Sequence, residues 1–432
     1  MRALIFMLLI VVSFTGVVIG QNLDDVVVVT DAEFGQQFPD VAYNSTDNNF
    51  LVVWEEQLND RFHDIHGVVL DGDTGQPTVE PFVIMSDSGG LDAPEVAYNS
   101  TDNEFVVVAR VASTDQAFGQ RVSPSGVLLG DFTVIDASGG PTFFDPAARA
   151  RVVSIAYNAT DNQYIAGLSG NPRSQILFSN LDLDIPVDEF GSGTNSSVAW
   201  SSVSNVYLVA WEDRESRNTG SENLSAQLLS ASGDLIGDTI IIRDQDFAEE
   251  SPRVAYNADD DQFMVIWDER IGFSDGLDPQ TLTDVIGQIV ATDGTLVGGT
   301  IAIEQTTAYS LRQDVDYSST AGAYLVVWKG DPSGDFAFAD IYGRLIGRDG
   351  SPASDIFLVY DGGDDATENF GSERYYDESK LPAVAVNTQS GDFLVVWEEA
   401  GTEGDPDMRD IYARFVRGGS AVAKHWQLYS SE

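Results

Sequence analysis

The segment Val41-Ala-Tyr-Asn-Ser-Thr-Asp-Asn-Asn-Phe-Leu-Val-Val-Trp54 decides the fold, because altered copies of it return six more times along the chain. The later copies begin at Val96, Ile155, Val198, Val254, Val315 and Val384. Successive starts lie 55, 59, 43, 56, 61 and 69 residues apart. A recurrence at this period is typical of a repeat architecture, in which each copy is one supersecondary unit.

Each copy holds two short runs of β-branched and aromatic residues around a polar turn, which predicts a β-hairpin. A third run follows at residues 65–70, 119–122, 226–229, 285–290, 341–346 and 411–416. A fourth run follows a glycine-bearing turn at residues 82–85, 132–135, 240–242, 301–303 and 356–359. The sequence therefore predicts an all-β fold, a seven-bladed β-propeller of four-stranded antiparallel blades.

Apolar residues occupy consecutive positions in these strands, as in Phe50-Leu-Val-Val-Trp54, so both faces of each sheet must be buried, which stacked blades provide. Alanine recurs at one step of the first strand, and we expect that strand to be innermost because a large side chain would crowd the axis: Ala42, Ala97, Ala156, Ala199, Ala255 and Ala385. Tryptophan ends the second strand in five copies and is expected to pack between blades: Trp54, Trp211, Trp267, Trp328 and Trp397.

Closure of the ring needs one more strand in the last blade. The run at residues 26–30 precedes the first copy in the position of a fourth strand and would complete that blade. The tail at residues 426–429 is the alternative. One of them is expected to join the first and last blades and so remove an open sheet edge.

The first 20 residues have the form of a secretory signal peptide. Met1 and Arg2 precede an apolar run over residues 3–19, and the small residue Gly20 ends it. We expect residues 1–20 to be this signal peptide and residues 21–432 to form a single propeller domain. An uncleaved N-terminal anchor is the alternative, since the run approaches the roughly 18 residues that cross a bilayer. Either way we expect the protein to be secreted, extracellular or on the cell surface, with the periplasm as a further compartment.

Acidic residues dominate the charge of the chain. It contains 69 Asp and Glu against 22 Lys and Arg, which gives a formal net charge of −47. Such a surface repels phosphate backbones and anionic lipid head groups, so neither nucleic acid nor membrane insertion of the mature chain is expected. The chain has no cysteine, which excludes disulfides and thiolate sites, and its three histidines leave little for imidazole chemistry.

The repeat also carries the motif Asp-Ile-Tyr-Gly-Arg at residues 340–344 and an altered form of it at residues 410–414. Together with the Val-Ala-Tyr-Asn and Leu-Val-Val-Trp elements, this organisation resembles the secreted β-propeller repeat proteins of microbes, over roughly residues 22 to 430. The resemblance implies the fold and export. That group is functionally unassigned, so it implies no catalytic residues. The Trp-acid pairs differ from those of WD40 repeats, because they end the second strand and lack a partner Gly-His.

The connections between strands fall at two poles of the predicted ring. One pole, here the turn pole, has short turns between first and second and between third and fourth strands. The other, here the loop pole, has longer acidic connections at residues 55–64, 212–223, 268–283, 329–339, 361–380 and 398–409. Rigid scaffolds tend to carry binding residues on such loops, so we expect a ligand at the loop pole.

One residue precedes each first strand at the centre of the loop pole. These mouth residues are Asp40, Glu95, Ser154, Ser197, Arg253, Asp314 and Ala383. We predict ligand binding by Asp40, Glu95, Arg253, Arg312, Asp314 and Asp316. Asp316 replaces the repeated alanine, and a carboxylate there needs an arginine, hydrogen bonds or a cation. A salt bridge from Arg253 or Arg312 is the favoured interpretation, and a Ca²⁺ site at Asp314 and Asp316 is the alternative.

Glycosylation sequons begin at Asn44, Asn99 and Asn158, in the same turn of successive copies. These stretches are also good turn sequences, because Asn, Ser, Thr and Asp accept backbone hydrogen bonds locally. Both interpretations stay open at the level of the sequence.

No Ser/His/Asp set, histidine-rich metal cluster or nucleotide-binding glycine loop is visible, so an enzyme is less expected than a binding protein. We therefore expect a secreted or cell-surface binding scaffold that recognises an extracellular glycan, peptide or protein and is either Ca²⁺-stabilised or free of cofactors. The first alternative is a polysaccharide-cleaving enzyme that uses carboxylates at the same pole. The second is a structural surface-layer or matrix protein.

Overall fold

The structure, a computed structural model, describes residues 22–30, 35–59, 62–111, 116–136, 154–168, 173–181, 183–186, 193–213, 223–244, 249–271, 282–305, 309–331, 340–362, 381–400 and 409–417. The predicted signal peptide and the tail at residues 426–429 lie outside these ranges. Every regular element in them is a β-strand. No helix among the described residues is long and apolar enough to cross a membrane.

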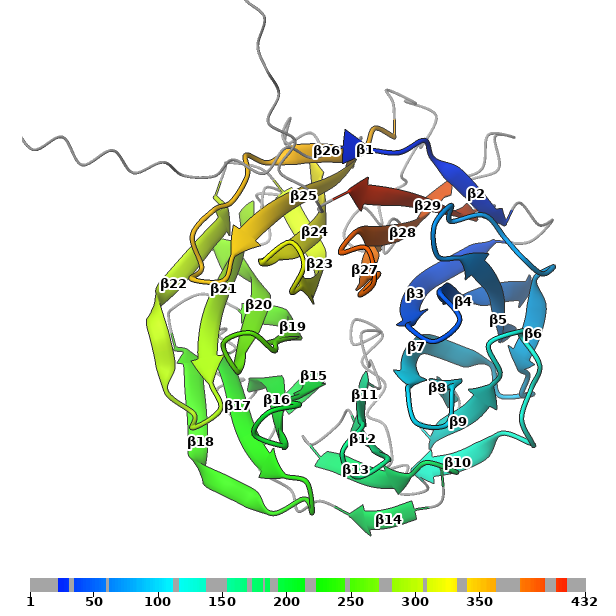
Figure 1. Ribbon diagram of the computed structural model, residues 1–432, viewed down its shortest axis with the longest axis horizontal. Coiled ribbons are helices and arrows are strands. Elements are labelled where there is room, and N and C mark those ends of the chain that lie inside the picture. Colours follow the sequence, from blue (N-terminus) through cyan, green and yellow to red (C-terminus); the bar gives the residue numbers. More distant parts are fainter. Residues whose placement is uncertain are drawn as a thin grey trace, which may run out of the picture.

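In the described residues, the strands form seven antiparallel sheets, six with four strands and one with five. Figure 1 shows these sheets as blades around a central axis. The predicted seven-bladed β-propeller is therefore confirmed, with one blade that has an additional strand.

The blades follow the chain in order. Blade 1 contains β3 (Gln36–Asn44), β4 (Asn49–Asn59), β5 (Phe62–Asp71) and β6 (Phe82–Met85). Blade 2 contains β7 (Leu91–Asn99), β8 (Glu104–Val111), β9 (Gln116–Val122) and β10 (Thr133–Asp136). Blade 3 contains β11 (Ser154–Asn158), β12 (Gln163–Leu168), β13 (Arg173–Phe178) and β14 (Leu183–Pro186).

The remaining blades repeat this arrangement. Blade 4 contains β15 (Gly193–Trp200), β16 (Val206–Asp213), β17 (Asn223–Ser230) and β18 (Leu235–Arg243). Blade 5 contains β19 (Glu249–Asn257), β20 (Gln262–Ile271), β21 (Leu282–Ala291) and β22 (Leu296–Glu304). Blade 6 contains β23 (Tyr309–Ser318), β24 (Ala323–Asp331), β25 (Asp340–Gly347) and β26 (Phe357–Tyr360). Blade 7 contains β27 (Ala383–Val386), β28 (Phe393–Ala400) and β29 (Arg409–Arg417), with β1 (Asn22–Leu23) and β2 (Val27–Thr30) from the start of the chain.

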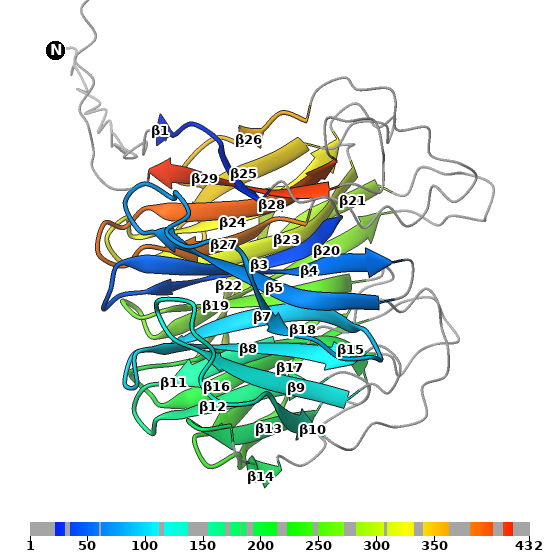
Figure 2. The ribbon, with the colours of Figure 1, turned by 90° about the vertical axis from the view of Figure 1, so that its right-hand side faces the viewer.

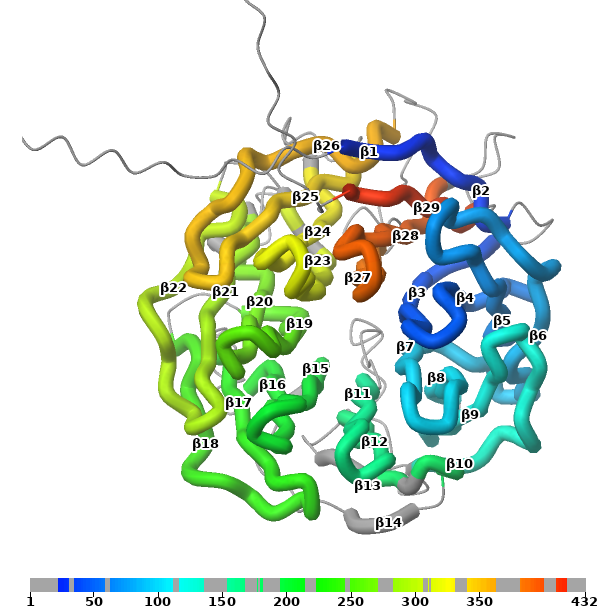
Figure 3. Tube along the Cα trace, in the orientation of Figure 1, coloured from blue at the N-terminus to red at the C-terminus, as the bar shows by residue number. Residues whose placement is uncertain are grey.

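The N-terminal strands close the ring. Both β1 and β2 pair with β29, with Asn22 opposite Arg417 and Val27 opposite Ala413. Figure 3 shows this junction, where the blue start of the trace runs beside the red end. The guanidinium of Arg417 also forms an ion pair with Asp24. The N-terminal strand therefore completes the last blade, as one of the two sequence alternatives proposed.

The core lies between the blades. The residues of Phe50-Leu-Val-Val-Trp54 are fully buried, as the consecutive apolar pattern predicts. Trp54 packs with Ala383 and Leu394 of the preceding blade, and Trp267 packs with Leu208 in the same manner. The prediction that tryptophans pack between blades is confirmed.

The first strand of each blade lies innermost (Figure 1), as the repeated alanine predicts. These strands contact one another around the axis, in the order β3, β7, β11, β15, β19, β23 and β27. Figure 2 shows the short turns between first and second strands gathered at one end of the ring. The first strands therefore begin at the opposite end, the loop pole.

Two features differ from the sequence prediction. The stretch expected as a loop at residues 55–64 is mostly strand, because β4 runs to Asn59 and β5 begins at Phe62. The predicted connections at residues 212–223, 268–283, 329–339 and 398–409 are likewise shortened by strand. Large parts of these, and most of residues 361–380, lie outside the described residues. Blade 3 has a third and a fourth strand, β13 and β14, that the sequence patterns did not identify.

The closing strand β2 provides a matched test of ring closure. Val29 is 4% exposed in the core between blades 7 and 1, whereas Val28 on the opposite face is 50% exposed. We expect Val29→Asp to lower the free energy of unfolding by about 3 kcal/mol or more, because it buries an unpaired charge. Val28→Asp should change it by less than about 0.5 kcal/mol. Urea denaturation measures both, and equal effects would contradict the assigned closure.

Candidate functional site

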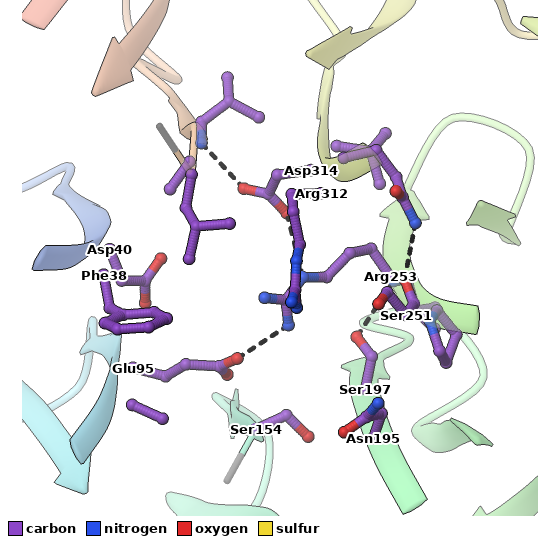
Figure 4. A pocket seen from close by; sticks show the side chains of 18 of the residues that line it. Phe38, Asp40, Glu95, Ser154, Asn195, Ser197, Ser251, Arg253, Arg312 and Asp314 are labelled. Carbon is purple, nitrogen blue, oxygen red and sulfur yellow. Dashed lines mark hydrogen bonds and ion pairs between the residues drawn. The ribbon is translucent and has the colours of Figure 1, made fainter. Parts of the chain in front are cut away.

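A cavity of about 240 Å³ lies on the axis at the loop pole. It is lined by the starting residues of the innermost strands from all seven blades (Figure 4). Every mouth residue named from the sequence lines it: Asp40, Glu95, Ser154, Ser197, Arg253, Asp314 and Ala383. Arg312 lines it too, whereas Asp316 is not among its lining residues. The structure thus brings five of the six predicted binding residues together, and their binding of a ligand stays a prediction.

A β-bulge orients the mouth side chain in five blades. The strand register shifts just before Asp40, Glu95, Ser197, Arg253 and Asp314. Two residues earlier the backbone is left-handed, at Phe38 (φ 53°), Ala93 (φ 49°), Asn195 (φ 51°), Ser251 (φ 54°) and Arg312 (φ 60°). A bulge re-aims the side chains that follow it, at a cost of order 1 kcal/mol for each left-handed residue that is not glycine. Such a conformation persists only where neighbouring groups hold it.

Buried acids of the preceding blade hold four of these bulges. The backbone N–H of the left-handed residue donates to the carboxylate that directly follows a second-strand tryptophan. Phe38 donates to Glu398 (2.6 Å) and Ala93 to Glu55 (2.6 Å). Ser251 donates to Glu212 (2.7 Å) and Arg312 to Asp268 (3.3 Å). The acids are 0–2% exposed, so each one is part of the contact between two blades.

This role of the acid was not predicted, although the repeated Trp-acid pairs are its signal in the sequence. Trp54-Glu55, Trp211-Glu212, Trp267-Asp268 and Trp397-Glu398 are those pairs. Finding the role requires the partner N–H, which lies in the next blade.

Some mouth residues also join their innermost strand to the next one. Asp40 Oδ2 accepts a hydrogen bond from Val96 N (2.7 Å), and Asp314 Oδ2 accepts one from Val384 N (2.8 Å). An innermost strand is paired on one edge only, and buried N–H groups on its other edge need acceptors. Each of these two carboxylates therefore uses one oxygen for a hydrogen bond between neighbouring blades.

Arg253 is the cation at the centre of the mouth. Its Nη1 lies 2.9 Å from Glu95 Oε1 across the axis, and its Nε lies 4.0 Å from Asp314 Oδ1 (Figure 4). Burial, together with repulsion from Asp314, raises the pKa of Glu95 to about 7 although Arg253 opposes the shift. Burial and repulsion from Glu95 and Asp314 also raise the pKa of Asp40 well above its usual range. The mouth therefore carries less negative charge near neutral pH than three fully ionised carboxylates would give it.

Asp316 follows Asp314 by two residues on β23, and its carboxylate binds backbone N–H groups. Its Oδ2 accepts a hydrogen bond from Val386 N (2.8 Å), and its Oδ1 accepts one from Tyr317 N (2.7 Å). Burial raises the pKa of Asp316 to about 7. Backbone N–H groups thus take the place that the salt-bridge interpretation gave to an arginine at Asp316, and Arg253 approaches Asp314 instead. Among the described residues, no group of three or more His, Asp or Glu is arranged to hold a metal ion, and the Ca²⁺ alternative stays a prediction.

A row of four buried carboxylates crosses blade 5 at the loop pole. Glu249 lies opposite Glu269, and Glu269 lies opposite Asp284, while Glu304 is next in line on β22. Arg243 donates to Glu269 at 2.7 Å, whereas both carboxylate oxygens of Glu249 lack hydrogen-bond partners. Burial and the neighbouring Glu269 raise the pKa of Glu249 to about 8. Sequence reasoning missed this row, because its members come from four separate strands.

The sequon asparagines serve the turns at the opposite pole. Asn44, Asn99 and Asn158 are fully buried, and Asn44 Oδ1 accepts from the N–H groups of Thr46 and Asp47. Their amide nitrogens donate to an asparagine of the next blade: Asn44 to Asn103, Asn99 to Asn162 and Asn158 to Asn205. These contacts agree with the turn interpretation.

Comparison with known proteins finds structural likeness but no family. No protein-family model matches the chain, and no curated protein matches it. A protein of unknown function from Dyadobacter fermentans is similar in structure, with a TM-score of 0.50, 12% identity, and 92% of this chain and 99% of that chain covered. The endosialidase of phage phi92 is similar at a TM-score of 0.53 and 10% identity, covering 94% of this chain and 71% of that chain. The chain has a β-propeller fold. At these identities the likeness shows the fold alone.

Glu212 tests the contact between acid and bulge. Its Oε1 accepts from Ser251 N and also from Asn195 Nδ2 (2.6 Å). We expect Glu212→Ala to lower the free energy of unfolding by about 1 to 3 kcal/mol, because it leaves these buried donors without that acceptor. Glu212→Gln keeps an acceptor and should cost less. Equal losses in the two variants, measured by urea denaturation, would show that the hydrogen bonds do not matter.

Glu249 tests the acid row by pH. Its folded pKa of about 8 lies above the unfolded value of about 4.3, so the folded state holds a proton that the unfolded chain releases. Stability from this group is therefore lost as the pH rises from about 4 to 8. Glu249→Gln mimics the protonated form, and its advantage in melting temperature over the unmodified protein should grow across that window. The exposed Glu80→Gln control should show no such gap, and a constant gap for Glu249→Gln would refute the assignment.

Proposed function

We propose that this chain is a binding scaffold that recognises an extracellular glycan, peptide or protein through the axial cavity at the loop pole. The observation that carries the proposal is the convergence of Asp40, Glu95, Arg253, Arg312 and Asp314 on one cavity in the described residues. A concave site on a rigid scaffold with a few convergent polar groups is the usual form of a binding site.

The scaffold supports binding because its mouth is held in place before any ligand arrives. Bulges, buried acids and hydrogen bonds between strands fix the backbone beneath the mouth side chains. A site that is already ordered loses less conformational entropy when a ligand binds.

The form of the N-terminus and the acidic surface support a secreted or surface location, with the periplasm as a further compartment. They also support an extracellular partner rather than nucleic acid or a membrane, because the net charge of −47 repels both. Ca²⁺ at Asp314 and Asp316 is the cofactor that this proposal includes as an option.

Polysaccharide cleavage at the same cavity is the second candidate function. One observation favours it: Glu95, with a pKa raised to about 7, is suited to hold a proton for a leaving group, and it shares the mouth with Asp314. One similar structure is named as an endosialidase, and the low identity limits that likeness to the fold.

A binding panel with mouth variants tests the proposal. Glycans and peptides are titrated calorimetrically against the protein, and the release of reducing ends is followed in parallel. We expect a ligand whose affinity falls at least about tenfold in the Asp40→Asn, Glu95→Gln double variant, which removes the mouth carboxylates of blades 1 and 2 but keeps acceptors for backbone N–H groups. Asp260→Asn at the turn pole is the matched control and should bind normally.

The outcomes separate the two candidates. Binding without product supports the scaffold, and product formation that Glu95→Gln abolishes supports cleavage. Binding that is identical in the mouth variant and in the turn-pole variant would overturn the assignment of the cavity, as would the absence of any ligand from the panel.

A further inference from the structure

Arg312 differs from the other arginines of the described chain. The guanidinium groups of Arg110, Arg121, Arg243, Arg253, Arg270, Arg348, Arg409 and Arg417 form ion pairs with carboxylates, and those of Arg344 and Arg414 donate to backbone carbonyls. Of the arginines whose side chains the structure describes, only Arg312 has a guanidinium with no such partner. Its backbone N–H donates to Asp268, while its side chain points into the cavity beside Arg253 (Figure 4).

An arginine without an ion pair is unexpected in this chain, because acids outnumber Lys and Arg by 69 to 22. The bulge explains the arrangement. It uses the N–H of Arg312 to join blades 5 and 6 and leaves the side chain free to extend over the mouth. A guanidinium is a rigid fork of donors that matches a carboxylate in a bidentate pair.

The carboxylates of the mouth already have a resident cation. Arg253 contacts Glu95 at 2.9 Å and approaches Asp314 to 4.0 Å, and Asp40 also acts on its charge. A cationic ligand would have to displace or outcompete Arg253. The guanidinium of Arg312 forms no ion pair with these carboxylates, and its charge acts on Asp268, so its N–H donors remain available to a ligand in the cavity.

The other walls favour a hydroxylated ligand of small size. The mouth carboxylates keep acceptor capacity toward the cavity, and hydroxyl groups are suitable donors for them. Phe38 presents its ring at the rim (Figure 4), where the C–H face of a sugar can pack. The volume of about 240 Å³ lies below the roughly 300 to 1,000 Å³ of pockets for drug-sized ligands, which suits one sugar unit.

We propose that Arg312 binds the carboxylate of an acidic sugar unit in the axial cavity, an inference that rests on the proposed binding function. The sugar hydroxyls donate to the mouth carboxylates, while the sugar carboxylate accepts from Arg312. A peptide C-terminus offers a carboxylate as well, but it brings fewer hydrogen-bond donors for Asp40, Glu95 and Asp314.

Acidic oligosaccharides and their carboxyl-reduced counterparts form the test pair. Uronate-terminated and sialate-terminated oligosaccharides are titrated against the full chain beside the same molecules after reduction of the carboxylate to an alcohol. We expect at least one acidic member to bind about tenfold more tightly than its reduced form, since hydrogen bonds between charged partners are strong. Arg312→Asn should abolish this preference, and Arg312→Lys should retain only part of it.

The variants are matched to the backbone of the site. Asn195 occupies the equivalent left-handed position in blade 4, so Arg312→Asn suits the local φ. Arg348→Asn removes an arginine that pairs with Asp260 at the turn pole, and it should leave the preference intact. Melting temperatures confirm that each variant folds.

The pH gives an independent readout. Glu95 faces Asp40, Arg253 and Asp314 in the mouth, and its pKa of about 7 means that it gains a proton as the pH falls from 8 to 6. Its repulsion of a bound carboxylate then decreases. The affinity for the acidic oligosaccharide should therefore rise over this interval relative to that for the reduced form.

Each outcome bears on one of the two proposals. Equal binding of acidic and reduced forms, or a preference that survives Arg312→Asn, overturns the acidic-sugar assignment and leaves the binding function standing. Binding of a peptide with a free C-terminus, but of no sugar, overturns the assignment in the same way. If no glycan or peptide binds at the mouth, the binding function itself fails.

Discussion

The structure depends on the burial of both faces of every blade. Along β4, Phe50, Val52 and Trp54 pack toward blade 7, whereas the alternating Leu51 and Val53 pack toward blade 2. A single sheet with this pattern would leave one apolar face in water, at roughly 25 cal/mol for each Å² exposed. Each blade therefore needs two neighbours, and a ring is the arrangement that gives every blade both. Completion of blade 7 by β2 is part of this same requirement.

Closing the ring creates a second problem at the axis. Each innermost strand pairs with the second strand of its own blade on one edge. Its other edge faces the innermost strand of the next blade, and among the described residues these two strands do not form a shared sheet. At both poles, side chains provide hydrogen bonds between neighbouring blades. Asp40 and Asp314 accept N–H groups of the next strand at the loop pole, and Asn44 and Asn387 bridge to the next blade at the turn pole. These four polar residues around the axis therefore stabilise the ring.

The sequence predicts those parts of the architecture that produce a periodic pattern of residues within one repeat. Each of three signals follows from a rule about a single strand: the consecutive apolar residues, the repeated alanine and the tryptophan that ends the second strand. The mouth residues were found in the same way, because each one directly precedes the first strand of its copy. Features that join distant blades were not predictable in this way. The pairing of Glu95 with Arg253 spans 158 residues, and the contact of Glu55 with Ala93 depends on a bulge that no local pattern announces. The strand Arg173–Phe178 was not predicted, because it has only a short apolar run, Ile176-Leu-Phe178.

The mouth separates groups that hold the ring from groups left for a ligand. Asp40 and Asp314 each commit one oxygen to a neighbouring strand, and Glu95 and Arg253 neutralise each other across the axis. These four residues therefore hold the ring together as well as line the cavity. Arg312 is different, because the fold uses its backbone N–H, while its guanidinium acts on Asp268 only through its charge and forms no ion pair. A guanidinium without an ion pair, placed where seven blades converge, is the feature of the described residues that points most directly to a ligand.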